Sequence, residues 1–424
     1  MYKRGIINLI VILLLVGTIL FCTTGMVFAR DNYAIGIGMK GEGLDTRDSV
    51  REAISAYSRA GYRVYGVSNP GKQHLWEQLY ADVQFFDCHG NQECVVTLIS
   101  GIVAGKDRMY GDKDCIGTDS VHWDADTILV IYSSCQGAGN NGQNNPNSVA
   151  RKTAQRGAEV VIAWRSSIEA GSSREWTRRY NDALADGYTV IKAMDYANSF
   201  SYRDDRVPQN STIIHHGNTD MKIGKYRKAN NLEEIRPEDN LLLKSSKNAR
   251  KNVALNTNNL ENVYSIIKET YPEFNEDNYI ISKGNAQSIN ENTGEIEETE
   301  YINLKLKVGD FETLSGFTIK AKNNVVEAIY DNTIDFNKEN NILHQKSAIT
   351  VRDNLNIEEL KNQAIDKVAK AYNNKVTIDK DGITYKYVYD VETGKKYIEF
   401  TIRTTLGDLS ENSPESYDNV KIEI

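Results

Sequence analysis

The chain has 424 residues, a hydrophobic fraction of 40% and a formal net charge of −8. Its length allows two or three domains, and its composition excludes a disordered chain. The negative charge and the lack of a concentrated basic cluster argue against nucleic acid as a partner.

Residues 1–29 have the layout of a secretory signal. The basic start MYKR precedes a long apolar run, and Val27 and Ala29 suit cleavage after Ala29. The run from residue 5 to residue 29 is also long enough for the alternative, an uncleaved anchor in the membrane. We therefore expect a secreted chain, or one on the extracellular side of the membrane that contacts it only through this segment.

Four cysteines follow, and they allow two interpretations. They are Cys88, Cys94, Cys115 and Cys135. In an oxidising compartment, four cysteines commonly form two disulfides. If Cys135 stays a reactive thiol, at most one bridge can form, and we expect it between Cys94 and Cys115.

Strand-like and helix-like segments alternate from residue 32 to residue 217. Amphipathic segments predict helices between six apolar strands, which read YAIGIGM, YRVYGVS, ADVQFFDCHG, TILVIYSSC, AEVVIAW and STIIHHG. Apolar strands that alternate with helices are typical of an α/β fold with a mostly parallel sheet covered on both faces. Functional sites in such folds lie beyond the carboxyl ends of the strands.

The composition changes after residue 217. Residues 218–240 are polar and charged, and they predict a linker. A faint repeat follows in residues 241–340 and 341–424, in which a helical segment precedes alternating strands joined by a Thr-Gly turn. We predict two small α+β units that pack together, because each alone buries little surface.

The third and fourth predicted strands end at residues that suit acyl transfer. FFDCHGN carries His89, and TILVIYSSCQGAG carries Cys135. If the strands are neighbours, the two side chains emerge side by side, and the histidine can generate the thiolate. Backbone N–H groups at Gly90 and Cys135 would stabilise an oxyanion, and Gly137 would leave room for a substrate backbone. Each motif alone is more often structural, but the pairing favours a catalytic dyad.

These motifs resemble the His-Gly and Cys motifs of caspase-like (clan CD) cysteine peptidases, and are most similar to CHAT-domain and clostripain-like members. The resemblance extends over residues 32–217, through Trp164 and an Ala-rich helix that includes Ala193. It implies a three-layer α/β/α sandwich with His89 as the catalytic histidine and Cys135 as the nucleophile. The implied reaction is hydrolysis of a protein or peptide through a thioester acyl-enzyme.

The resemblance leaves the substrate preference open. The substrate-pocket candidates are Asp87, Ser133, Gly137, Trp164, Arg165 and Glu169. Ser133 stands where Arg-specific relatives often carry an acid. Glu169 would favour a basic side chain before the scissile bond, whereas Arg165 would favour an acidic one.

We expect no cofactor and no metal ion. The stretch HWDAD, residues 122–126, and the pair His215-His216 contain metal-ligating residue types. A loop and a sheet edge explain them as well, because two acids with one histidine are weak evidence for a metal site.

The C-terminal half weakly resembles PepSY-like modules, which are often attached to secreted peptidases as inhibitory or chaperoning segments. We expect this half to inhibit the peptidase half within the same chain, or to dock it to a surface partner. The alternative for the whole chain is a catalytically inactive caspase-like protein that binds extracellular partners, in which Cys135 is structural.

Overall fold

The computed structural model describes eleven segments of the chain. They are residues 32–121, 123, 127–140, 143–210, 220–227, 241–247, 257–290, 295–344, 349–351, 355–405 and 413–424. The N-terminal signal or anchor, the sixth predicted strand, the His215-His216 pair and most of the linker and of HWDAD lie outside the described residues. No helix within the described segments has both the length and the apolar character that crossing a membrane requires.

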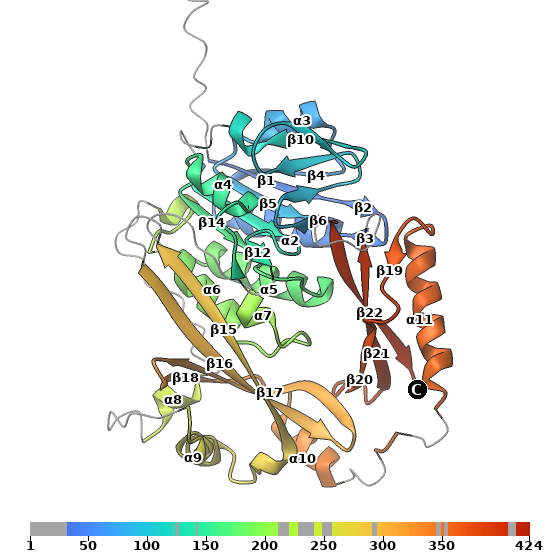
Figure 1. Ribbon diagram of the computed structural model, residues 1–424. Helices are drawn as coiled ribbons and strands as arrows, with labels where there is room; N and C mark the ends of the chain where they lie inside the picture. The colour runs from blue at the N-terminus through green and yellow to red at the C-terminus, as the bar shows by residue number, and fades with distance from the viewer. Residues whose placement is uncertain are drawn as a thin grey trace, which may run out of the picture.

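A five-stranded sheet forms the centre of the N-terminal half (Figure 1), and all of its strand pairs are parallel. Its strands, in the order in which they lie, are β14 (Val160–Ala163), β11 (Leu129–Ser133), β5 (Val83–Asp87), β1 (Tyr33–Gly38) and β4 (Arg63–Ser68). The parallel sheet predicted from the alternating pattern is therefore present, with five of its six expected strands among the described residues.

Helices pack on both faces of this sheet. One face carries α2 (Arg47–Arg59), α5 (Ala170–Ala185) and α6 (Val190–Asn198), and the other carries α3 (Lys72–Gln78) and α4 (Val149–Gln155). Each face has its own apolar core, so residues that point to either side of β5 and β11 are buried. Burial on both sides explains why these strands are continuously apolar. The arrangement is the α/β fold with a parallel sheet covered on both faces that the alternating pattern predicts.

An insertion between β5 and β11 forms a small second sheet that the sequence pattern did not predict. Its strands are β6 (His89–Asn91), β7 (Cys94–Val96), β8 (Ser100–Val103), β9 (Arg108–Tyr110) and β10 (Lys113–Gly117). The remaining short elements of this half are β2 (Lys40–Gly41), β3 (Leu44–Asp45), β12 (Gly139–Asn140), β13 (Gln143–Asn144), α7 (Val207–Asn210) and the 3-10 turns Thr118–Ser120 and Gly224–Tyr226.

The predicted Cys94–Cys115 disulfide is absent, and the four described cysteines are free thiols. Cys94 lies on β7 and Cys115 on β10, and β8 pairs with both strands and lies between them. Two strand spacings separate their Cα atoms by roughly 10 Å, whereas a disulfide needs less than about 7 Å. Both thiols are buried in one small apolar cluster.

The C-terminal half contains two units, each with a helix packed on antiparallel strands. The first comprises α8 (Leu242–Ser245), α9 (Glu261–Thr270), the 3-10 turn Glu276–Asn278, β15 (Tyr279–Asn290), β16 (Glu295–Val308), β17 (Phe311–Lys322), β18 (Val325–Asp331) and α10 (Phe336–His344). The second comprises α11 (Ile357–Ala371), β19 (Thr377–Ile378), β20 (Thr384–Tyr389), β21 (Lys396–Thr405) and β22 (Glu415–Glu423). This is the α+β build expected from the alternating strands.

The second unit reaches the N-terminal half through its last strand. β22 pairs with β21 along its whole length, and its first residue, Glu415, also pairs with Gly90 of β6. Figure 1 shows β22 rising from the second unit to β6, beside the carboxyl end of the parallel sheet. The C-terminal sheet and the sheet of the insertion are therefore continuous.

Candidate functional site

The register of β5 and β11 sets the positions of His89 and Cys135. Asp87 pairs with Ser133 at the ends of these parallel strands, and each candidate lies two residues further along its chain. The two chains stay in contact beyond the pair, because a Cβ placed on Gly90 would lie 2.8 Å from the Ser134 Cβ. The two sequence motifs therefore meet at one edge of the sheet.

A tight turn carries the chain past Cys135. The next residue, Gln136, has a positive φ of 58°, which is uncommon for a residue other than glycine. Its N–H donates to the Ser166 carbonyl at 3.1 Å, and its own carbonyl accepts from the Gly139 N–H at 2.9 Å. Backbone of this kind persists only where its surroundings enforce it, and it is common at functional sites.

The Cys135 thiol is buried and protonated in this structure. It donates to the Ile168 carbonyl at 3.7 Å. Burial, with a further contribution from the negative charge of Glu415, raises the pKa of the thiol to about 12. Because the nucleophilic form of cysteine is the thiolate, the site as it stands is not reactive at neutral pH.

The His89 imidazole is also enclosed. Its side chain is buried, and neither ring nitrogen has a well-formed hydrogen bond within the described residues. Burial lowers the pKa of His89 to about 4, although backbone groups of Glu42 and Glu415 nearby favour the protonated form. The ring of Tyr372, the residue that directly follows α11, stacks on the imidazole, with centroids 6.2 Å apart. His89 is therefore a neutral base that the C-terminal half covers.

Strand β22 lies across the site and contacts both of its sides. Glu415 pairs with Gly90 on one side, and Tyr417 bridges to Glu169 on the other. The backbone edge at Gly90, expected to face an oxyanion, is therefore paired with the chain's own C-terminal strand.

The side chain of Glu415 lies close enough to Cys135 for its charge to act on the thiol. Its carboxylate accepts from Gln136 Nε2 at 2.5 Å, from the Ser167 hydroxyl, and from Arg403 Nε at 2.6 Å. Arg403 belongs to β21 of the same C-terminal unit, whereas Gln136 and Ser167 belong to the N-terminal half. Strand β22 thus places a buried carboxylate of the C-terminal half among hydrogen-bond donors of the N-terminal half.

Two of the pocket candidates have packing environments instead. Trp164 lies in the core, where its indole N–H donates to the Ser173 hydroxyl at 2.9 Å and its ring meets Trp176 edge-on. A Cβ on Gly137 would make only ordinary contacts, 3.4 Å or more from its nearest neighbours. Trp164 therefore packs in the core, and the room that Gly137 would leave for a substrate backbone stays a prediction.

The two charged candidates have partners away from the thiol. The Arg165 guanidinium donates to the Gln287 side chain at 3.0 Å and to the Gln209 carbonyl at 2.5 Å. The Glu169 carboxylate caps α5, because the N–H groups of Gly171 and Ser172 donate to it at 2.6 Å each. Arg165 therefore joins the two halves, and Glu169 begins a helix.

Asp87 and Ser133 precede His89 and Cys135, respectively, by two residues, and they lie on the face of the sheet that α2 and α5 cover. The Ser133 hydroxyl bonds to the Ser173 hydroxyl at 2.9 Å. Burial raises the pKa of Asp87 to about 7, although hydrogen bonds from Ser49 and Ser133 oppose the shift. Since its side chain bonds to these serines, Asp87 does not orient the His89 ring.

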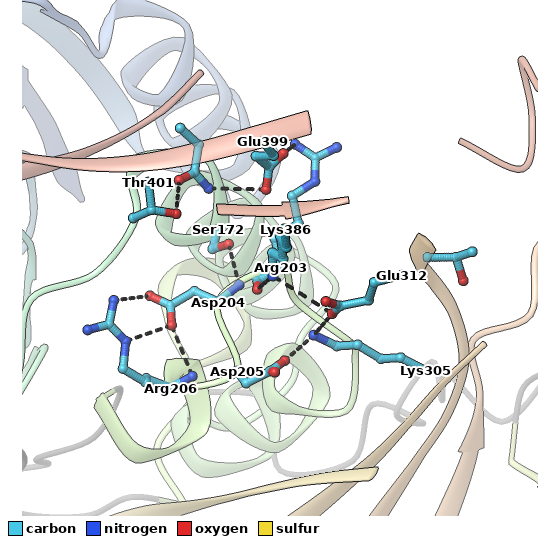
Figure 2. Close-up of polar contacts among 12 residues, drawn as sticks. Ser172, Arg203, Asp204, Asp205, Arg206, Lys305, Glu312, Lys386, Glu399 and Thr401 are labelled. Atoms are coloured by element: carbon cyan, nitrogen blue, oxygen red, sulfur yellow. Dashed lines mark hydrogen bonds and ion pairs between the residues drawn. The ribbon is translucent and has the colours of Figure 1, made fainter. Parts of the chain in front are cut away.

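Ion pairs fasten both C-terminal units to the loop between α6 and α7 (Figure 2). Lys305 of β16 is almost fully buried, and it pairs with Asp205 and, at 3.0 Å, with Glu312. Arg203 pairs at 3.3 Å with Glu399 of β21, whose side chain is fully buried. In each pair one side chain is buried, and leaving a buried charge without its partner is costly. These contacts therefore hold each C-terminal unit against the N-terminal half.

Sequence reasoning missed the residues that cover the site. Tyr372, Arg403 and Glu415 lie more than 230 residues beyond Cys135 in the chain, and no motif marks them.

The described part of the chain contains no group of three or more His, Cys, Asp or Glu side chains arranged to hold a metal ion.

Comparisons with known proteins give a limited result. No protein-family model and no curated protein matches the chain. Among solved structures, the chain is similar to the complex of Porphyromonas gingivalis RgpB pro- and mature domains, with 12% sequence identity and a TM-score of 0.31. That match covers 39% of this chain and 42% of the other, so it concerns part of the fold only.

Proposed function

We propose that the chain is a cysteine peptidase whose C-terminal half holds it in an inactive state. The observation that carries the proposal is the register of β5 and β11, in which His89 and Cys135 follow directly paired residues at one sheet edge. The enforced turn at Gln136 supports the assignment of Cys135 as the nucleophile.

The proposed reaction begins when β22 withdraws and water enters. The loss of burial lowers the pKa of Cys135 and raises that of His89, so the imidazole can take the thiol proton. Sγ then attacks the substrate carbonyl carbon, and the oxyanion forms near the N–H groups of Cys135 and Gly90. The C–N bond breaks as His89 returns the proton to the leaving amine. Water, deprotonated by His89, hydrolyses the thioester and regenerates the thiol.

Three contacts support intramolecular inhibition. The backbone of Glu415 occupies the strand edge at Gly90, its carboxylate opposes the formation of a thiolate at Cys135, and the ring of Tyr372 covers His89. A substrate needs access to the same three groups. Release of β22 is therefore the proposed activating step.

The proposed place of action is outside the cell, either secreted or on the surface of the membrane. The basic and apolar pattern of residues 1–29 supports this location. The substrate class is a protein or peptide that reaches the site in extended form.

A second candidate function is that of an inactive binding protein with a caspase-like body. It is favoured by the lack of a hydrogen bond between His89 and Cys135, since the thiol donates to Ile168 instead. In that case β22 is a permanent part of the fold, and Cys135 is a buried apolar residue.

A digest of a peptide library separates the two functions. The full chain carrying Tyr372→Ala, which weakens the cover over His89, is compared with the same chain carrying Cys135→Ala as well. We expect cleavage only when Cys135 is present. Cleavage by both proteins would contradict the mechanism, and alkylation of Cys135 without cleavage of any peptide would favour the binding protein.

A further inference from the structure

The starting point is the buried carboxylate of Glu415. A carboxylate that leaves water needs hydrogen-bond donors or cations around it. Only 3% of the Glu415 residue surface is exposed, and three side chains donate to its carboxylate. Two of these donors, Gln136 and Ser167, belong to the N-terminal half rather than to the C-terminal unit that carries Glu415.

One of those donors is the sequence neighbour of Cys135, and the other is the neighbour of a residue that contacts its thiol. Gln136 directly follows Cys135, and Ser167 directly precedes Ile168, whose carbonyl accepts the thiol proton. The Glu415 backbone meanwhile pairs with Gly90, next to His89. The carboxylate of Glu415 is therefore bound by neighbours of Cys135 and of Ile168, while its backbone is paired next to His89.

Arg206, a cation of the N-terminal half, lies close enough to Glu415 for its charge to act on that carboxylate. The Arg206 side chain pairs with Asp204, at 2.9 Å from Nε to the nearer carboxylate oxygen, and lies over the Tyr417 ring of β22 at 5.3 Å. Burial raises the pKa of Glu415, while the charges of Arg403 and Arg206 act against that rise. When β22 leaves, Arg403 leaves with it, but Arg206 stays.

We propose that Gln136, Ser167 and Arg206 form the subsite for the substrate side chain next to the scissile bond, and that this subsite takes an acidic side chain, Asp or Glu. Glu415 occupies the subsite in the inactive state as an internal mimic of the substrate side chain. This inference rests on the proposed peptidase function and names its substrate class.

The positions of the other charged candidates agree with this assignment. The guanidinium of Arg165 is engaged with Gln287 and Gln209, and the carboxylate of Glu169 is engaged with the first turn of α5. Asp204, the acid nearest to Arg206, is held by that arginine. Gln136 and Ser167, which donate to Glu415 from the N-terminal half, are thus free to receive a substrate side chain once Glu415 leaves.

The test uses the full chain with Glu415→Ala, which empties the subsite, and Glu415→Gln as a second variant if the first fails to fold. Four fluorogenic peptides differ only in the residue before the scissile bond, which is Asp, Glu, Gln or Lys. We expect kcat/KM for the Asp and Glu peptides to exceed that for the Gln and Lys peptides by at least about tenfold, because a site built for a polar group rejects analogues that lack it.

Arg206→Gln in the same background tests the role of the cation. If Arg206 binds the substrate side chain, the substitution should lower the ratio of kcat/KM for the Glu peptide to kcat/KM for the Gln peptide towards one. If Arg206 has only a structural role, the substitution should slow the cleavage of both peptides equally. Arg59→Gln is the matched control, since Arg59 is an exposed arginine on α2 that pairs with Asp182, and its ratio should not change.

The outcomes separate this inference from the proposed function. Equal or better cleavage of the Gln or Lys peptide, or an equal loss on all peptides with Arg206→Gln, would overturn the acidic subsite and leave the peptidase intact. If Cys135 is alkylated readily but none of the four peptides nor a wider library is cleaved, the peptidase function itself fails, and the subsite fails with it.

Discussion

Replacing Tyr372 by alanine should open the site in a measurable way. The ring packs against His89 and against Gly43, where an added Cβ would lie 1.9 Å from the ring, and it is 1% exposed. A buried tyrosine side chain removes roughly 200 Å² from water, worth about 5 kcal/mol at about 25 cal/mol per Å². The ring also belongs to the core between α11 and its sheet. If about half of the total is assigned to that core, about 2–3 kcal/mol remains for covering His89.

The assay is the rate at which iodoacetamide alkylates Cys135, followed on the peptide that contains this residue. A loss of about 2–3 kcal/mol from the closed state should raise the rate about 30- to 150-fold. Val368→Ala is the control, because Val368 lies in the same core of α11 and is not stacked on His89. Equal acceleration by both variants would refute the reasoning, since it would mean that general loosening of α11, rather than the cover over His89, controls access.

Three further predictions follow from single positions. Gly43→Ala, a change in the N-terminal half, should also raise the alkylation rate of Cys135. The φ angle at this position is +78°, and an added Cβ would collide with the ring of Tyr372. An unchanged rate would argue against that contact. Asp87→Asn should remove a pH dependence of stability. Burial raises the folded-state pKa of Asp87 from 3.8 to about 7, so its stabilising contribution is complete below about pH 4 and is lost as the pH rises through about 7. At pH 8 the variant should be about 4 kcal/mol more stable to urea than the wild type, with little difference at pH 4, and parallel pH profiles would contradict this. Lys305→Met should destabilise the docked first unit by about 1–3 kcal/mol, because Glu312 loses a partner while Asp205, whose side chain is 40% exposed, is partly solvated without one. Adding Asp205→Asn should restore part of the loss in thermal unfolding, and a double variant no more stable than the single one would count against the ion pair.

The sequence predicted the parts of the fold that depend on local pattern. Continuous apolar segments alternating with helices require a sheet covered on both faces, and β5 and β11 are such strands. The ends of neighbouring parallel strands lie side by side, so the pattern placed His89 and Cys135 together only on the condition that their strands are neighbours, and β5 and β11 do pair. The alternation of the C-terminal strands likewise predicted helices packed on antiparallel sheets.

The pocket candidates were harder to predict, because residue type does not reveal what a side chain bonds to. Arg165 and Glu169 are charged residues near the end of β14, and either is suitable for a substrate pocket. The fold uses one to join the two halves and the other to cap α5. The Cys94–Cys115 bridge was wrong for a similar reason, since spacing along the chain does not show that β8 lies between the two cysteines.

The sequence alone determined which strands carry the thiol and the imidazole, because the apolar pattern that marks a strand and its end lies within a short stretch of chain. Only the tertiary structure decided the state of those groups. The pKa of each depends on burial and nearby charge, and the distant C-terminal half contributes the charge of Glu415 near Cys135 and the ring of Tyr372 against His89. Contacts across such a separation leave no periodic pattern in the sequence, so the cover over the site becomes visible only when the chain is folded.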